Sequence, residues 1–328
     1  IPSPLYKITS ETTKDASKHP VDPLTAFDDA SRRKCVFNVR NTQQGVVLGF
    51  SERSSDTVLS ISSCAVLVPQ ISGSLDDLRE ICASLPQTKK PFRLSVLATQ
   101  NGLDLSLEGS VPLNENTKTV LVRKALASGF ARFSSDGEIL IEPQKPVLKM
   151  GICEVAPPPG AFVQAVEAAE TAMANLVCDH LSDCKSVADL FCGIGTFALS
   201  LAGKSIVWAV EENASALAAL DQAWRETGGK LKQVKTETRN LDRRPASFQE
   251  LKKIDGVVFD PPRAGAEAQA RQIAKSKVRK VAAVSCNPVT LVRDLGILMD
   301  GGYRIHRITP IDQFKYTPHV EIVVLLER

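Results

Sequence analysis

Short apolar segments alternate with helical stretches through the second half of this chain, and no other feature of the sequence constrains the fold so strongly. Four apolar segments have the length and the β-branched content of buried strands: 187–191, 205–210, 256–260 and 281–285. Helical periodicity follows three of them, over 196–202, 214–226 and 289–299. Such alternation predicts an α/β fold with a parallel sheet and helices on both faces, closed by two further strands over 303–311 and 320–326.

The first half of the chain has the texture of a mostly antiparallel α+β domain. Apolar or alternating segments between turn signals predict strands over 35–40, 46–50, 57–61, 65–68, 92–99 and 103–108, and helices over 75–85 and 117–128. Three prolines and a glycine at 157–160 form a rigid break, and helical texture over 161–181 follows. We therefore expect a linker over 1–32, an α+β domain over 33–150 and a second domain over 151–328.

The 328 residues are 43% hydrophobic and 23% charged, which is the composition of a globular chain with a large core. No apolar run reaches the roughly 18–20 residues that a membrane span needs. The net charge of +3 excludes a polybasic tail as the means of binding nucleic acid, but leaves a local basic face open. Eight cysteines are too few for a secreted disulfide scaffold. We therefore expect a cytoplasmic monomer without membrane contact.

A glycine-rich turn, DLFCGIGTFA, follows the first apolar segment of the second half. Gly193 and Gly195 let the backbone turn sharply into a helix and let a ligand approach closely. Glu211 ends the next predicted strand, where its carboxylate can accept hydrogen bonds from both hydroxyls of a ribose. NAD and S-adenosylmethionine both fit this pattern, and so does a tight turn without a ligand, so the loop alone does not identify a cofactor.

Two later strand ends favour base methylation over hydride transfer. Asp260 follows an apolar strand and precedes two prolines and Arg263. The prolines remove backbone donors and fix the loop at the sheet edge where open α/β sheets bind ligands. Cys286 follows the next strand and precedes Asn-Pro and a helix, whose N-terminus is expected to stabilise the thiolate.

Four segments resemble, in order, the motifs of the RNA 5-methyluridine (uracil-C5) methyltransferase family: DLFCGIGTFALSLA at 189–202, DPPRAGA at 260–266, SCNPVTLVRDL at 285–295 and DQFKYTPHVE at 312–321. The resemblance covers about 159–328, and the first half also looks like the central domain of the bacterial 23S ribosomal RNA members. It implies a C-terminal Rossmann-like methyltransferase domain that uses S-adenosylmethionine, preceded by an RNA-contacting domain. The implied reaction is methylation of C5 of a uridine in RNA, with ribosomal RNA favoured and transfer RNA as the alternative.

The same resemblance assigns roles to individual residues. Cys286 is implied to be the nucleophile that adds to C6 of uracil, which gives C5 the enolate character it needs to accept a methyl group. Glu321 is implied to be the base that removes the C5 proton, although its position alone fits a solvated carboxylate on an edge strand equally well. Arg263 is expected at the substrate. The residues expected at the cofactor are Gln164, Phe191, Gly193, Gly195, Thr196, Glu211, Asn240 and Asp260.

One cysteine resembles a ligand of an iron–sulfur cluster. The ribosomal RNA members often carry an N-terminal TRAM domain and three clustered cysteines, which hold a [4Fe-4S] cluster together with a later fourth cysteine. Cys64 resembles that fourth ligand, whereas no C-x-x-C spacing occurs in this chain. We therefore expect a cluster only if cysteines outside this sequence complete it, and a buried core thiol is the alternative for Cys64.

Other functions stay open at this point. An RNA 5-methylcytosine methyltransferase would typically carry a second cysteine in the Asp-Pro loop, which reads Asp-Pro-Pro-Arg here. A non-catalytic RNA-binding or ribosome-assembly protein on the same fold would not need both Cys286 and Glu321. Two sets of basic residues could contact RNA phosphates: Arg239, Arg243 and Arg244, and then Arg271, Lys275, Lys277, Arg279 and Lys280. A solvated helix face explains the second set equally well.

Overall fold

The computed structural model describes residues 20–52, 57–87, 91–109 and 112–328, which fall into two compact units. The N-terminal unit consists of Asp28–Lys149 and Ala156–Glu167. The C-terminal unit consists of Met150–Val155, Ala168–Arg328 and the described part of Ile1–Phe27. The linker predicted over 1–32 lies partly outside the described residues, and its described part contributes to both units.

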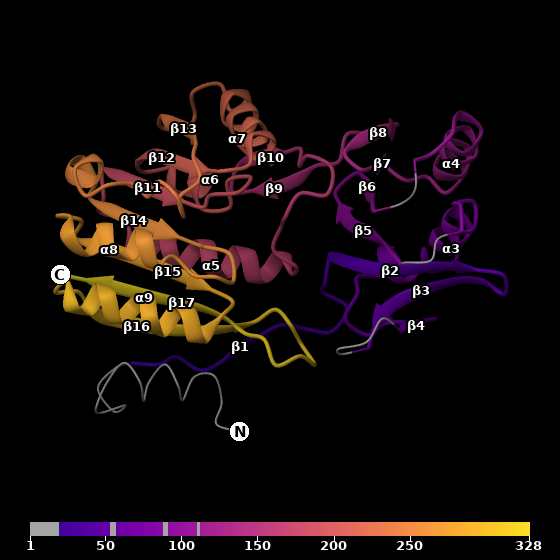
Figure 1. Cartoon of the computed structure of the whole chain (residues 1–328). Helices are drawn as coiled ribbons and strands as arrows, with labels where there is room; N and C mark the ends of the chain where they lie inside the picture. Colours follow the sequence, from indigo (N-terminus) through magenta and orange to yellow (C-terminus); the bar gives the residue numbers. More distant parts are fainter. Residues whose placement is uncertain (1–19, 53–56, 88–90, 110–111) are drawn as a thin grey trace. The chain divides into compact units, whose positions relative to one another are not determined.

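An eight-stranded sheet forms the centre of the C-terminal unit (Figure 1). Its order is β1-β16-β17-β15-β14-β11-β12-β13, with bounds Thr25–Ala26, Arg304–Asp312, Glu321–Glu327, Lys280–Ser285, Gly256–Phe259, Ser186–Leu190, Ile206–Glu211 and Val234–Thr238. All pairings are parallel except those of β17, which is antiparallel to both of its neighbours. The chain runs from β11 outward to β13 and then resumes on the other side of β11 at β14. Such a reversal opens a crevice at the carboxyl ends of the strands, where open α/β sheets bind ligands.

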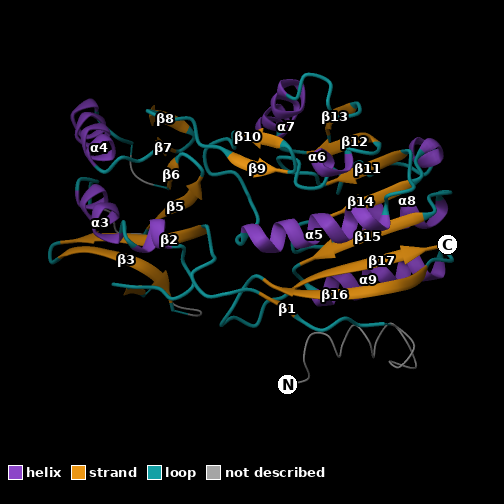
Figure 2. Ribbon diagram, turned by 180° about the vertical axis from the view of Figure 1, so that it is seen from behind, coloured by secondary structure: helices purple, strands orange, loops and turns teal. Residues whose placement is uncertain are grey.

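Helices cover both faces of this sheet. Their bounds are α5 Glu167–His180, α6 Ala198–Leu201, α7 Ala214–Glu226, α8 Glu267–Lys275 and α9 Pro288–Asp300, with a 3-10 turn η2 at Glu250–Lys253. The two views place α8 and α9 on one face of the sheet and α5 on the other (Figures 1 and 2). Asn213 and Asn287 cap the N-termini of α7 and α9, each cap contributing about 1 kcal/mol. Among the described residues no helix is long and apolar enough to cross a lipid bilayer.

The N-terminal unit is built on a seven-stranded sheet in the order β4-β3-β2-β5-β6-β7-β8. The bounds are β2 Lys34–Thr42, β3 Gly45–Ser51, β4 Val58–Ser60, β5 Phe92–Thr99, β6 Gly102–Glu108, β7 Arg132–Ser135 and β8 Glu138–Ile141. Only β6 and β7 pair in parallel, through a crossover that contains α4, Glu115–Ala127. A buried apolar layer packs the sheet against α2 Pro69–Ser72, α3 Leu75–Ala83 and α4. A separate hairpin of β9 Leu148–Met150 and β10 Cys153–Val155 completes the elements.

Two local predictions are wrong. The segment 65–68 is not a strand: Leu67 makes a single bridge to Arg32, and Pro69 then begins α2. The helix predicted from residue 161 begins only at Glu167. The preceding residues are held in a loop because Lys34 Nζ donates to the carbonyl of Ala161 and Arg33 Nε to that of Gln164. These long-range donors lie about 130 residues away, where the helical periodicity cannot reveal them.

Candidate active site

The strand register brings a thiol and a carboxyl group together at the carboxyl edge of the C-terminal sheet. β15 and β17 are antiparallel, with Ser285 opposite Ile322. The same register continued by one residue sets Cys286 opposite Glu321. Asp260 follows β14, the parallel neighbour of β15, so three of the predicted site residues meet at one edge.

The Asp260 loop is attached to the helix that follows Cys286. Asn287 Nδ2 donates to the carbonyl of Arg263 at 2.8 Å, in addition to capping α9 with its Oδ1. About two turns further along α9, Asp294 accepts a hydrogen bond from the backbone N–H of Ala266 at 2.6 Å. The helix that follows Cys286 therefore also holds the loop that carries Asp260 and Arg263.

The electrostatics of Cys286 differ from the sequence-based expectation. Burial raises the pKa of its half-buried thiol, and the carboxylates of Glu321 and Asp260 raise that pKa further. Arg263 opposes both effects through its charge and a hydrogen bond. These effects act against the expected stabilisation of the thiolate by the N-terminus of α9, because desolvation and two nearby acids raise the thiol pKa.

Glu321 is enclosed rather than solvated, with 4% of its surface exposed. Burial and then the negative charge of Asp260 raise its pKa to about 8, against the smaller opposing effects of Gln313 and Arg263. Gln313 Nε2 donates to Oε1 at 3.1 Å, while Oε2 has no hydrogen-bond partner among the residues that the structure describes. A carboxyl group with a pKa near neutrality and one oxygen available is suited to proton transfer.

The glycine loop and Glu211 form a second part of the edge. Glu211 Oε2 accepts from the backbone N–H of Gly193 at 3.1 Å, and its Oε1 accepts from those of Glu212 and Asn213, both at 2.9 Å. Phe191, Gly193 and Gly195 all have positive φ angles, of 63°, 54° and 104°. Backbone N–H groups of the glycine loop and of the residues after β12 thus hold the Glu211 carboxylate in place.

Close packing beneath the loop explains the second glycine. A Cβ atom on Gly195 would lie 2.9 Å from Leu220 and 3.0 Å from Leu199. Thr196 donates from Oγ1 to Glu170 at 3.0 Å, which ties the loop to α5. Gly195 is therefore required by both its φ angle and the leucines under it.

The remaining predicted residues, Asn240, Gln164 and Cys64, lie in different parts of the structure. Asn240 follows β13, further along the edge that holds Glu211. Gln164 belongs to the N-terminal unit, so its role at the cofactor stays a prediction. Cys64 is half-buried and not bonded to another cysteine, and the described residues contain no group of three or more potential metal ligands. These residues alone do not supply a cluster site.

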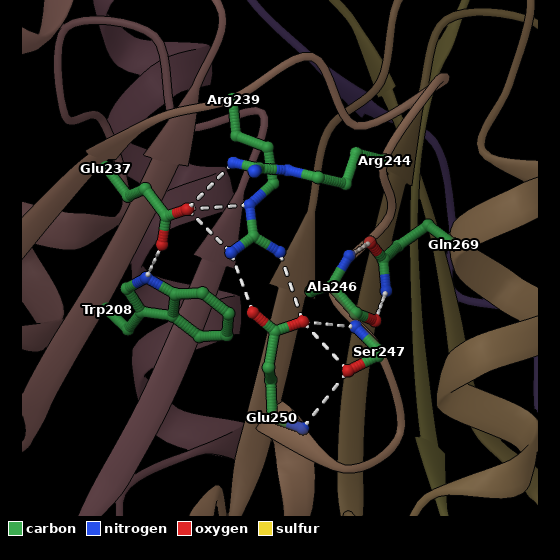
Figure 3. Close-up of polar contacts among 8 residues, drawn as sticks. All are labelled: Trp208, Glu237, Arg239, Arg244, Ala246, Ser247, Glu250 and Gln269. Atoms are coloured by element: carbon green, nitrogen blue, oxygen red, sulfur yellow. Dashed lines mark hydrogen bonds and ion pairs between the residues drawn. The ribbon is translucent and has the colours of Figure 1, made fainter.

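Arg239 is not a surface residue that can contact phosphates. Its side chain is 8% exposed and lies between the carboxylates of Glu237 and Glu250 (Figure 3). Arg244 is exposed, although it too reaches Glu237, at 3.3 Å. The prediction that Arg239 contacts phosphates is therefore wrong, because the sequence does not show which member of an arginine-rich turn faces inward.

Asp189 is an acid at this edge whose pKa is raised. Asp189, the last residue but one of β11, is fully buried. Burial raises its pKa well above the ordinary range, and the charges of Asp260 and Glu211 add to the effect. The signal in the sequence was an acid inside an apolar strand immediately before the glycine turn.

Comparisons with known proteins find RNA methyltransferases. A family model described as tRNA (uracil-5-)-methyltransferase matches residues 157–328. An uncharacterized RNA methyltransferase of Brucella melitensis is 51% identical over 94% of this chain and 74% of its own length. A 23S rRNA (uracil(1939)-C(5))-methyltransferase, RlmD of Edwardsiella ictaluri, is 32% identical over 89% of this chain and 67% of its own length.

A solved structure shares the fold of nearly the whole chain. The tRNA (uracil-54, C5)-methyltransferase of Pyrococcus abyssi, in complex with S-adenosyl-L-homocysteine, superimposes with a TM-score of 0.74. The match covers 98% of this chain and 82% of that chain at 20% sequence identity. At this identity the likeness establishes the fold, and the site has to be argued from its own residues.

Proposed function

The chain belongs to the tRNA (uracil-5-)-methyltransferase family of S-adenosylmethionine-dependent RNA methyltransferases, and from this premise we propose that it methylates uridine through a covalent bond between Cys286 and C6 of uracil. The observation that carries the proposal is the convergence of Cys286, Asp260, Arg263 and Glu321, whose charges act on one another at a single sheet edge. Cys35, Cys82, Cys153, Cys178, Cys184 and Cys192 do not have two carboxylates and an arginine of this edge among their electrostatic neighbours.

The proposed reaction begins at the thiol. Cys286 gives its proton to water and the thiolate adds to C6 of uracil, so that the C5–C6 double bond becomes an enolate with its electron density on C5 and O4. C5 then takes the methyl group of S-adenosylmethionine, whose methyl–sulfur bond breaks and leaves its electron pair on sulfur, so that S-adenosylhomocysteine is released. Arg263, which already lowers the pKa of Cys286, can stabilise the negative charge of the enolate.

Glu321 completes the reaction. Its carboxylate removes the proton from C5, the C5–C6 double bond re-forms, and the bond from C6 to sulfur breaks to release the Cys286 thiolate. The raised pKa of about 8 makes the conjugate acid stable at neutral pH, which favours proton uptake from carbon. Burial of Glu321 also keeps bulk water away from the carboxylate.

At the cofactor, we assign Glu211 to the ribose hydroxyls. Three backbone N–H groups already hold this carboxylate in place, so little conformational freedom is lost when the ligand binds. Phe191, Gly193, Gly195 and Thr196 line the neighbouring turn, and Asp260 faces the methionine end.

We favour ribosomal RNA as the substrate, with transfer RNA as the alternative. The 32% identity to a 23S rRNA methyltransferase over 89% of this chain supports the first, whereas the description of the family model supports the second. Because the enzyme must reach C5 and C6 of a stacked base, the target uridine has to leave its stack, at a cost of a few kcal/mol that an RNA loop would reduce.

Two measurements test the proposal. Mapping 5-methyluridine by mass spectrometry in ribosomal and transfer RNA, from cells with and without the gene, should reveal one missing methyl group and thereby the substrate. Purified enzyme should form a denaturation-resistant adduct with 5-fluorouridine RNA, since fluorine cannot leave as the proton does.

Cysteine variants supply the matched controls for the adduct. Cys286→Ala should lose both the adduct and methyl transfer, whereas Cys178→Ala, which removes a half-buried thiol on α5, should keep both. Methylation by Cys286→Ala would refute the covalent mechanism. Binding of S-adenosylmethionine and RNA without methylation of any uridine would instead favour a non-catalytic RNA-binding protein. Formation of 5-methylcytidine would identify an RNA 5-methylcytosine methyltransferase.

A further inference from the structure

The loop between β13 and η2 is joined to the strand end that carries Glu211. The backbone N–H of Arg239 donates to the carbonyl of Glu211 at 2.8 Å. The side chain of Asn240 donates from Nδ2 to Glu212 Oε1 at 2.7 Å, and its Oδ1 accepts from the backbone N–H of Arg243 at 2.8 Å. The carboxamide of Asn240 is therefore held from both sides in one orientation.

A buried guanidinium clamps the beginning of this loop. Arg239 donates from Nε to Glu237 Oε1 at 2.7 Å, and from Nη2 and Nη1 to Glu250 at 2.7 and 3.2 Å (Figure 3). Its Nη2 also forms an ion pair with Glu237 Oε1 at 2.6 Å. The guanidinium lies 5.4 Å from the ring centre of Trp208, whose Nε1 donates to Glu237 Oε2 at 3.2 Å. One side chain thus links β13 and η2 by charge-assisted hydrogen bonds and lies against the Trp208 ring of β12.

The far end of the loop is fixed just as firmly. Gln269 of α8 is 1% exposed, and its amide pairs with both backbone groups of Ala246, at 2.8 and 3.0 Å (Figure 3). Ser247 and Glu250 then form a capping box, in which each side chain accepts from the backbone N–H of the other. With both ends fixed, the loop presents Asn240 with little conformational freedom.

The order of groups along the sheet edge supports the position beside the adenine that the family resemblance implies for Asn240. The Asp260 loop, the Gly193 turn, Glu211 and Asn240 follow the adjacent strands β14, β11, β12 and β13. An elongated nucleoside with its ribose at Glu211 and its sulfonium end toward Asp260 would extend its base toward β13. The half-exposed Asn240 stands at that end.

We propose that Arg239 and Glu212 are positioning residues, which hold the carboxamide of Asn240 against the adenine of S-adenosylmethionine. The proposal rests on the assignment of Glu211 to the ribose. Glu212 selects an amide at position 240, because Nδ2 of Asn240 donates to it, whereas an aspartate there would set two carboxylates at hydrogen-bond distance. Arg239 acts indirectly, because it holds the backbone that carries Asn240.

A charge swap tests the role of Glu212. Calorimetry with S-adenosylhomocysteine should find the affinity of Asn240→Asp weakened about tenfold, as expected when a charged hydrogen bond is replaced by repulsion. Glu212→Gln should bind nearly as well as the wild type, because the glutamine oxygen can still accept from Asn240. The double variant should recover most of the loss, since glutamine can donate to aspartate. A double variant as weak as Asn240→Asp, or an unchanged Asn240→Asp, would overturn the pairing.

The selectivity of the site for adenine tests the role of Arg239. A general loss of stability would weaken binding of both ligands equally and leave their affinity ratio unchanged. The ratio of affinities for S-adenosylhomocysteine and S-inosylhomocysteine, which differ only at the base, should fall toward one in Arg239→Met and be partly kept in Arg239→Lys. Arg271→Met, which removes an exposed arginine of α8, should keep the wild-type ratio. An unchanged ratio in both Arg239 variants would refute the positioning role. Failure of the wild type to bind S-adenosylhomocysteine would instead refute the cofactor site itself.

Discussion

Replacing Glu321 by glutamine should remove a pH-dependent penalty on folding. In the folded protein the pKa of this carboxyl is raised from 4.5 to about 8. The main cause is burial, because only 4% of the residue is exposed and its negative charge loses contact with water. Between these two values the unfolded chain has lost the proton while the folded chain keeps it. The folded state therefore binds more protons, and the free energy of unfolding falls as the pH rises from about 4.5 to about 8.

The size of this effect follows from the shift. At about 1.4 kcal/mol per pKa unit, the wild type should lose on the order of 4 kcal/mol of stability between pH 5 and pH 8 through Glu321 alone. Glutamine has a similar shape and does not titrate, so Glu321→Gln lacks this loss. The stability difference between the variant and the wild type should therefore grow in favour of the variant as the pH rises.

Urea denaturation at pH 5, 6.5 and 8 measures the difference directly. Glu154→Gln, on the exposed side of β10, provides a matched glutamate-to-glutamine control whose difference from the wild type should stay constant. Parallel stability curves for the wild type and Glu321→Gln would refute the reasoning, because they would mean that Glu321 is ionised in the folded protein at neutral pH.

Four further outcomes are expected. Glu321→Gln, incubated with uridine RNA and S-adenosylmethionine, should accumulate a methylated covalent complex visible by intact-mass spectrometry, and full turnover would remove Glu321 as the base. Asp260→Asn should speed the alkylation of Cys286 by iodoacetamide at pH 8, because it removes a carboxylate that raises the thiol pKa; an unchanged rate would contradict this. Glu211→Ala should weaken binding of S-adenosylhomocysteine by about 1.5–3 kcal/mol in calorimetry, and unchanged affinity would exclude the ribose contact. Gly195→Ala should lower the free energy of unfolding by about 1–3 kcal/mol, because its φ is positive and its Cβ would meet two leucines; wild-type stability would show that the loop adapts.

The sequence could predict the edge of the sheet at which the site lies, because strand ends and residue type are local properties. Cys286, Asp260 and Glu211 each come directly after or at the end of an apolar segment, and parallel strands bring such positions to one edge. The strand β13 was not predicted, since its sequence VKTET carries polar residues at most positions and only Val234 is buried.

The sequence could not predict how the charges at that edge behave. The pKa values of Cys286 and Glu321 depend on burial and on Asp260, which is 26 and 61 residues away in the chain. The helix-end argument for Cys286 considered only its immediate neighbours, so it left out the burial and the two acids that raise the thiol pKa. In the same way, the burial of Arg239 depends on Glu250 and Trp208, which no spacing rule associates with it.

The opposition between Cys286 and Glu321 suggests an order for the proton transfers in the proposed reaction. A carboxylate at Glu321 raises the pKa of Cys286, and by reciprocity a thiolate at Cys286 disfavours the ionised form of Glu321. The thiolate that attacks C6 is therefore best tolerated while Glu321 is protonated. Once sulfur is bonded to carbon it carries no charge, the repulsion disappears, and Glu321 can lose its proton to water in time to act as the base. The site thus needs to hold only one of these two negative charges at each stage, first on sulfur and then on the carboxylate.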